Sequence, residues 1–360
     1  MNRFSLVLVS FFVFHSVLVP SQYDVECFRK EGMNDTETIQ AALDCVGSKG
    51  HGKIEFEGTR TYIIAENLEL PRYGSGIIIL EGNGCVLQGK KGINIFNRIP
   101  ENQKEALGKM MNMRFYIQNF TFEKGDKAIN LGATFGSKIS DCSFYFQKVA
   151  AVDIQFGLMT SIENCMSTLC SNDNFILRCG LDWGGNGYNS QSNHSHIKSC
   201  RVFAAKESNS GFKVLGSNGV TLEDVISEGF SEIKYSIYVS NSKSIAHLFY
   251  IKNVHIEHNP TEAGIFLAFD GYVTIDGLFF QTAKEDFPII KSVQNNATNH
   301  ILNVRWCPGK VIIQNQGHLH GIKWHLENCH SCFYDQNRWK RKDDEGNWIE
   351  GFPKALFKKS

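Results

Sequence analysis

The chain has no excess of charge of either sign and very little proline. Its 37 lysines and arginines balance 37 aspartates and glutamates, and only 7 of its 360 residues are proline. A balanced chain lacks the basic surface that nucleic-acid binding needs, so we expect no nucleic acid among its partners. Hydrophobic residues at 42% and charged residues at 21% exclude wholesale disorder. The 27 phenylalanines and 32 glycines instead favour strands and tight turns.

Long hydrophobic runs are missing after the first twenty residues. The stretch from Phe4 to Val19 is mostly apolar, follows Arg3 and precedes small residues near Ser21. It is shorter than the roughly 20 apolar residues that a membrane span needs. We therefore predict that residues 1–21 are a signal peptide, that the protein is secreted to the extracellular space, and that it has no membrane span. An uncleaved anchor is the alternative.

One short pattern recurs along most of the chain. An aliphatic residue, a spacer, a small polar residue and an apolar residue follow one another, as in Ile139–Cys142 and Ile162–Cys165. A repeat of some 20 to 40 residues is typical of a solenoid. The small polar position of the pattern is occupied by Asn119, Asp141, Asn164, Ser199, Asp224, Asn253, Gly277 and Asn303.

The residue types between these positions predict strands rather than helices. One unit divides into Gly211–Leu215, Val220–Leu222 and Val225–Ile226, and the next into Ser236–Val239, Leu248–Ile251 and Val254–Ile256. Three strands per turn, stacked in parallel, define an all-β right-handed parallel β-helix solenoid. Asn and Asp tolerate a left-handed backbone and can hydrogen-bond along the stack, so we expect a tight bend at the small polar position.

The domain boundaries follow from this pattern. We predict one β-helix domain over residues 24–330 and a polar C-terminal tail over 331–360. Residues 34–47 are predicted to form an N-terminal capping helix. Asn34 is its N-cap, Glu37 completes a capping box, and Ile39, Leu43 and Val46 share one apolar face with Ala42.

Several segments resemble the opening of pectate-lyase-superfamily proteins. They are Asn34–Asp44, Gly52–Phe56, Tyr62–Ile64 and Glu81–Gly84. The resemblance implies the pectin-lyase fold, a helix over the open end of the β-helix, and a carbohydrate partner. Viral and phage tail-spike β-helices are similar too.

The enzyme signatures of that superfamily are missing. Asn172–Asn174 fails the Asn-x-Asp signature of polygalacturonase-like hydrolases, and Gly317–Gly321 only echoes Gly-His-Gly. The resemblance therefore implies a fold and a carbohydrate partner, but no reaction. Two hypotheses stay open. The chain binds and depolymerises an acidic polysaccharide, as a lyase or a glycoside hydrolase, or it is a non-catalytic glycan-binding adhesin or spike-like structural protein. A monomer and a homo-oligomer are both compatible with the sequence.

In the related folds saccharide lies along the outer face of the first strand column. Alternation predicts that Asp153 and Gln155 point outward, since Val152 and Ile154 point inward. By the same argument, outward-pointing side chains are predicted at Asn130, Arg178, Lys213, Tyr238 and Phe266. A guanidinium binds carboxylate or sulfate, and aromatic rings stack on sugars. The alternative is an ordinary sheet face whose charges pair between turns.

The longest step of the repeat, from Asn164 to Ser199, places an insertion directly after the Arg178 strand. Insertions in solenoids often border the binding face. We predict that Trp183 and Tyr188 wall a cleft and bind substrate with Gln155, Tyr238 and Phe266. Hydrolysis needs paired carboxylates, and β-elimination needs a base and charge neutralisation. The predicted catalytic residues are therefore Asp153, Asp182, Arg178 and Lys213.

The opposite edge of the solenoid holds secondary candidates at Glu207, Glu228 and Glu257. His255 and Glu257 share one face of a strand, which makes two metal ligands conceivable beside His258, but surface polar residues at a strand end are the favoured interpretation. We predict no metal site and no cofactor, with Ca²⁺ as the alternative.

The cysteines divide into two groups. Cys142, Cys165 and Cys200 occupy the same inward position of the repeat, which predicts a buried stack of unpaired thiols. A disulfide between Cys27 and Cys45 is one way to fix the capping helix. The Cys329–Cys332 pair has zinc-like spacing among nearby histidines, but disulfide formation is favoured in a secreted chain.

Overall fold

The computed structural model describes most of the chain after the predicted signal peptide. The described residues are 21–185, 189–205, 208–229, 232–240, 247–257, 260–268, 271–281, 289–294, 300–305, 310–315, 322–327, 331–334 and 339–340. Some predictions concern residues outside these ranges. They are the signal peptide, of which residues 1–20 are not described, and the roles suggested for Tyr188, Glu207, His258 and Cys329.

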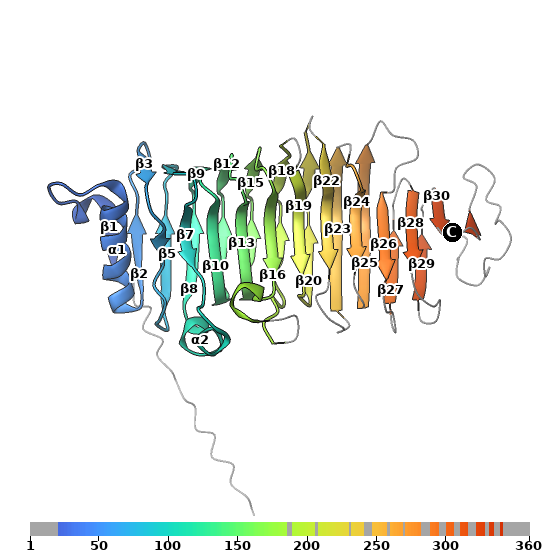
Figure 1. Cartoon of the computed structure of the whole chain (residues 1–360), viewed down its shortest axis with the longest axis horizontal. Coiled ribbons are helices and arrows are strands. Elements are labelled where there is room, and N and C mark those ends of the chain that lie inside the picture. The colour runs from blue at the N-terminus through green and yellow to red at the C-terminus, as the bar shows by residue number, and fades with distance from the viewer. Residues whose placement is uncertain are drawn as a thin grey trace, which may run out of the picture.

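The described residues form a long parallel β-helix, which confirms the predicted β-solenoid (Figure 1). Every strand pairs in parallel with the equivalent strand of the next turn, except that β30 and β31 pair antiparallel. One strand column forms a 12-stranded sheet and the other columns form a 19-stranded sheet.

The first strand column consists of twelve strands, which form the 12-stranded sheet. They are β4 (Leu68–Glu69), β7 (Asn94–Arg98), β10 (Lys127–Phe135), β13 (Ala150–Leu158), β16 (Asp173–Arg178), β19 (Ser208–Leu215), β22 (Ile233–Ser240), β24 (Ala263–Ala268), β26 (Ile290–Gln294), β28 (Lys310–Asn315), β30 (Ser331–Tyr334) and β31 (Trp339–Lys340).

The 19-stranded sheet contains the other strands of each turn. They are β1 (Gln22–Asp24), β2 (Gly52–Glu55), β3 (Thr61–Ile64), β5 (Ile77–Glu81), β6 (Val86–Gly89), β8 (Arg114–Gln118), β9 (Thr121–Lys124), β11 (Lys138–Ser140), β12 (Ser143–Tyr145), β14 (Ser161–Glu163), β15 (Met166–Thr168), β17 (His196–Lys198), β18 (Arg201–Phe203), β20 (Val220–Glu223), β21 (Ile226–Glu228), β23 (His247–Glu257), β25 (Gly271–Gln281), β27 (His300–Arg305) and β29 (Ile322–Glu327).

The bend between the two short strands of a turn follows the predicted polar column. The backbone is left-handed at each described non-glycine member up to Asn253, with φ between 49° and 60°, and at Gly277 with φ 77°. Side-chain amides bond along the stack, from Asn164 to Asp141 at 3.3 Å and from Asn253 to Asp224 at 3.1 Å. In β23 and β25 the strand continues through this bend, so two predicted strands, Leu248–Ile251 and Val254–Ile256, are one.

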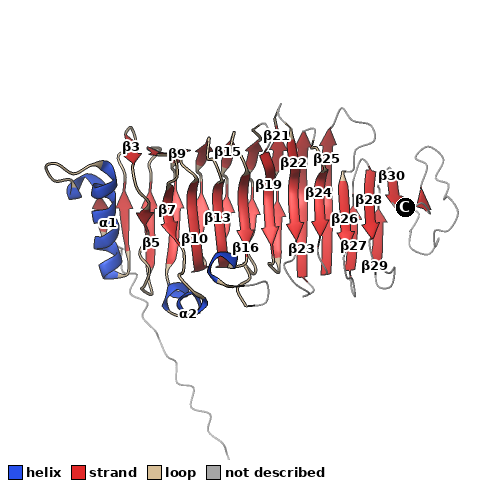
Figure 2. Cartoon of the chain, viewed as in Figure 1, coloured by secondary structure: helices blue, strands red, loops and turns tan. Residues whose placement is uncertain are grey.

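Helical segments lie at the N-terminal end and along one edge of the stack (Figure 2). Helix α1 (Asp35–Lys49) starts with the predicted capping box between Asn34 and Glu37 and buries its apolar face against the first turn. The 3₁₀ helix η1 (Val25–Phe28) precedes it. Helix α2 (Gln103–Leu107), η2 (Lys109–Asn112) and η3 (Leu181–Trp183) belong to two insertions described below. Among the described residues no helix is both long and apolar enough to cross a bilayer.

The core between the sheets is a column of aliphatic and aromatic side chains. Phe122 stacks on Phe144 with ring centroids 5.2 Å apart, and Phe175 stacks on Phe212 at 5.7 Å. Like side chains repeat from turn to turn because the strands pair in register. This regular core holds the outward side chains of each turn at fixed places.

The predicted thiol stack is confirmed, since Cys142, Cys165 and Cys200 are free and buried. The suggested Cys27–Cys45 disulfide is wrong in this structure, because both thiols are free. Segment η1 buries Val25 and turns Cys27 outward. Residues 331–334, predicted as tail, form β30 and extend the 12-stranded sheet.

Candidate functional site

In-register pairing places the predicted Asn130, Asp153, Lys213, Tyr238 and Phe266 in one outward row of the 12-stranded sheet, but Ile176 takes the place predicted for Arg178. In-register partners run from Asn97 through Asn130, Asp153, Ile176, Lys213 and Tyr238 to Phe266. Arg178 is not a member of this row, because it pairs in register with Gln155. Gln155 and Arg178 thus belong to a second row, and the Arg178 side chain reaches Asp153 of the first row.

Asp153 is the centre of a closed ion-pair network. Its side chain is almost fully buried, although it points away from the core. Arg178 donates from Nε to Oδ1 at 2.7 Å and from Nη2 to Oδ2 at 2.8 Å, and Lys127 Nζ lies 2.6 Å from Oδ2. Burial alone would raise the pKa of Asp153, but the contacts with Arg178 and Lys127 outweigh it and hold the pKa below its usual range. Asp153 is therefore ionised at neutral pH.

The network continues to Asp182, at the start of the insertion. Arg178 donates to both Asp182 oxygens, at 2.9 and 2.7 Å, and Gln155 Nε2 donates to Oδ2 at 2.9 Å. The hydrogen bond from Arg178 lowers the pKa of Asp182. The same contacts raise the pKa of Arg178 against the effect of burial. Asp182 is 47% exposed, and Asp153 is 2% exposed.

The other predicted cation is also paired within the sheet. Lys213 Nζ lies 2.7 Å from Asp173 Oδ2, and Asp173 also accepts hydrogen bonds from Asn209 and Ser210. Charges on this face thus pair between turns, which is the alternative that the sequence left open. Sequence reasoning missed Lys127 and Asp173, because strict alternation does not turn either side chain outward.

The predicted aromatic pair does come together. The rings of Tyr238 and Phe266 are stacked, with centroids 5.2 Å apart and an angle of 9°, and Lys213 Nζ lies 5.8 Å from the centroid of the Tyr238 ring. Both side chains are half-buried. One ring face of Tyr238 therefore lies against Lys213 and the other against Phe266.

The insertion after β16 does not use Trp183 as predicted. The indole is buried rather than exposed in a cleft wall, and it packs on Phe156 with Ala106 and Met110. Gly180 permits this position, because a Cβ there would lie 1.7 Å from the Trp183 ring. Apolar partners from another insertion draw the indole inward, and their position could not be read from the repeat.

That second insertion, which carries α2 and η2, leaves the β-helix at the same edge (Figure 1). It is anchored by Arg98, which is fully buried. Its guanidinium donates to five backbone carbonyls: Pro71, Arg72, Met110, Gly132 and Ala133. Burial lowers the pKa of Arg98 to about 9. The two insertions form one apolar cluster beside the network of Asp153.

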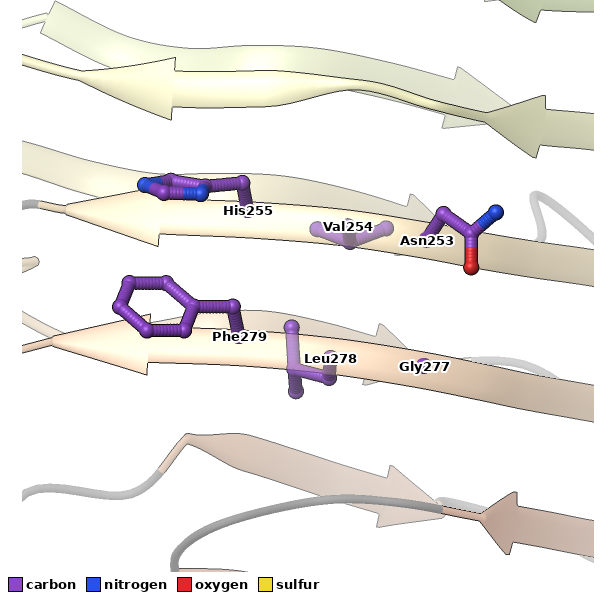
Figure 3. Close-up of a pocket in the computed structure, with 6 residues that line it drawn as sticks. All are labelled: Asn253, Val254, His255, Gly277, Leu278 and Phe279. Atoms are coloured by element: carbon purple, nitrogen blue, oxygen red, sulfur yellow. The ribbon is translucent and has the colours of Figure 1, made fainter.

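A second group of polar side chains lies on the 19-stranded sheet. Glu228 and Glu257 are in-register partners, and His255 is two residues before Glu257 on the same face. One potential ligand atom from each of these three residues lies within 4.8 Å of the others. A shallow pocket of about 400 Å³ adjoins His255 and is lined also by Asn253, Val254, Gly277, Leu278 and Phe279 (Figure 3).

Comparison with known proteins gives likeness of fold only. No protein-family model and no curated protein sequence matches the chain. Solved structures with a similar course include a tailspike protein of the E. coli bacteriophage HK620 in complex with a pentasaccharide, at 11% identity and a TM-score of 0.43 over 86% of this chain and 65% of that one. The chain therefore spans just under two thirds of the tailspike chain.

Two exopolygalacturonases are also similar. The Yersinia enterocolitica Family 28 enzyme has 10% identity and a TM-score of 0.46, over 88% of this chain and 78% of that one. The Thermotoga maritima enzyme has 10% identity and a TM-score of 0.40, over 92% and 94%. The fold defined by the strands above is the parallel β-helix that the pectate-lyase resemblance implied.

Proposed function

We propose that this protein binds a polysaccharide along the outward row of the 12-stranded sheet and does not cleave it there. The observation that carries the proposal is the closed network Lys127–Asp153–Arg178–Asp182. It holds the polar side chains in place before any ligand arrives, and preorganisation lowers the entropy cost of binding.

The same network argues against catalysis by the predicted residues. Glycoside hydrolysis needs a carboxylic acid whose pKa is raised, so that it can protonate the leaving group. The pKa values of Asp153 and Asp182 are both lowered. A lyase needs a base and a free cation, but Arg178 and Lys213 already neutralise carboxylates of the chain.

The compensated charges also bear on the substrate class. An acidic polysaccharide would have to compete with Asp153, Asp182 and Asp173 for the two predicted cations. We therefore favour a neutral polysaccharide, whose hydroxyls bond to the exposed carboxylate of Asp182 and whose apolar edges contact Tyr238 and Phe266. Secretion and the extracellular location remain part of this proposal.

A glycan-binding screen with reducing-end release measured in parallel tests the proposal. We expect binding of a neutral polysaccharide without release of reducing ends. Tyr238→Ala should weaken that binding about tenfold, in line with a contact worth roughly 1 to 2 kcal/mol. Tyr250→Ala is the matched control, because Tyr250 is an exposed tyrosine of the 19-stranded sheet. Release of reducing ends that Asp182→Asn abolishes would overturn the non-catalytic assignment.

A further inference from the structure

Glu228, His255 and Glu257 form a three-sided group that the β-helix brings together from two turns. Glu228 ends β21, while His255 and Glu257 end β23, and the two glutamates face each other in register. Like charges directly opposite on neighbouring strands are destabilising unless a cation lies between them. Arg201 pairs with Glu228 at 2.9 Å, whereas the ion-pair partner of Glu257 among the described residues is the imidazole of His255 at 3.0 Å.

The histidine is oriented toward this group and its inner nitrogen is unused. His255 Nε2 is itself buried and forms no hydrogen bond with the described residues. Glu257 Oε1 lies 3.0 Å from Nε2, close enough for an ion pair, but the geometry is not that of a hydrogen bond. The imidazole ring of His255 packs against the ring of Phe279, with centroids 4.5 Å apart, and this contact fixes the plane of the imidazole. A buried, unpaired imidazole nitrogen beside two carboxylates is the environment of a metal ligand.

We propose that Glu228, His255 and Glu257 bind a divalent transition-metal ion of the Zn²⁺ class. One imidazole nitrogen and two carboxylate oxygens are a common ligand set for such ions, whereas Ca²⁺ takes oxygen ligands alone. Tetrahedral zinc ligands are about 3.4 Å apart at the usual bond lengths. The ligand atoms here lie within 4.8 Å of one another, and rotation of the half-exposed Glu257 side chain closes that gap.

The surroundings suit an ion with one open position. Arg201 Nε lies 2.9 Å from Oε1 of Glu228, so it acts as the outer partner that orients a ligating carboxylate. The pocket beside His255 exists where Gly277 replaces the small polar side chain of the other turns, and it gives solvent or a small ligand access from that side (Figure 3). The site lies on the other sheet from the proposed glycan row and does not depend on it.

The test is metal binding by the full mature chain, prepared without a tag and stripped with EDTA. Calorimetry with ZnCl₂ and absorption spectroscopy with CoCl₂ should show one equivalent that Glu228→Gln, His255→Gln and Glu257→Gln each weaken by roughly tenfold or more. Zn²⁺ should also raise the melting temperature of the parent protein, and less so that of the variants.

The chain provides its own matched control. His196 Nε2 lies 2.9 Å from Glu163 Oε1 on the same sheet, but Lys138 occupies the other carboxylate oxygen at 2.6 Å. His196→Gln should therefore leave metal binding unchanged. The difference in metal affinity and stoichiometry between the parent and each variant reports on this site alone, even if histidines elsewhere bind metal. Equal stoichiometry and affinity in the parent and in the three variants would overturn the proposal, as would equal losses in His196→Gln.

Discussion

Arg178 forms a bidentate pair with Asp153, in which Nε and Nη2 each donate to a separate carboxylate oxygen, at 2.7 and 2.8 Å. The pair spans adjacent turns and is covered from solvent, so it differs from a surface ion pair of small worth. Arg178 also reaches Asp182, and through it the pair ties the insertion to the sheet.

The two aspartates of the network should differ in their contribution to stability. Asp153→Asn removes a buried charge and leaves Lys127 and Arg178 without their shared partner, which should cost about 3 to 5 kcal/mol. Asp182→Asn alters a half-exposed group and should cost no more than about 1 kcal/mol. Urea unfolding of both variants measures this difference. Equal costs would show that Asp153 is not the centre of the network.

Stability should fall on acidification below about pH 4.5. The hydrogen bond from Arg72 lowers the pKa of Glu105 to about 2. Partial burial of Glu163 opposes the shift, but Lys138 and His196 lower its pKa to about 2 as well. The unfolded chain takes up these protons near pH 4.5, so the stability is complete above that pH and is lost as the pH falls to about 2.

Urea midpoints measured between pH 7 and pH 2 test this expectation. Glu105→Gln and Glu163→Gln should each flatten the acid limb of the curve. An acid limb that is unchanged in both variants would assign the loss to other carboxylates.

The eight cysteines whose side chains the structure describes should fall into reactive and protected groups. Burial raises the pKa of Cys142 and Cys200, and an un-ionised buried thiol reacts slowly. Cys27 is exposed and should be alkylated in the native protein. Iodoacetamide labelling followed by peptide mass spectrometry separates the groups, with labelling in denaturant as the control. Native labelling of Cys142, Cys165 and Cys200 would contradict the buried stack.

Arg98 should be essential to the position of the insertion that carries α2 and η2. Arg98→Lys keeps the charge but cannot reach five carbonyls, and each buried acceptor left unpaired costs about 1 to 3 kcal/mol. We expect a loss of at least about 3 kcal/mol in urea unfolding and faster tryptic cleavage at Lys104. Arg114→Lys is the control, because Arg114 is exposed and should change stability by less than about 1 kcal/mol. Unchanged cleavage at Lys104 would argue against the anchor.

The fold was predictable because the residues that recur in the repeat have clear backbone preferences. Asn119, Asp141 and Asn253 tolerate the left-handed bend, and their regular spacing fixes where each turn begins. The insertions follow no repeat, so nothing in the sequence places Trp183 against Met110. The sequence also did not show which long side chains reach a neighbouring turn, as Lys127 does to pair with Asp153.

The group at Glu228 was within reach of the same repeat. Glu228 and Glu257 each lie four residues after a member of the polar column, Asp224 and Asn253, so they had to be neighbours on the stack. The same offset on the preceding turn places Glu228 beside the strand that carries His255 and Glu257. A repeat predicts contacts between turns as well as strands within them.

The thiol stack has a consequence for how the protein must be made. Cys142, Cys165 and Cys200 are shielded only after neighbouring turns have stacked around them. Parallel pairing between distant strands is slow to form. In an oxidising medium, stacking of the turns therefore competes with oxidation of the thiols. A thiol that has formed a mixed disulfide no longer fits its small apolar place in the core. The yield of native protein will depend on whether stacking outruns oxidation.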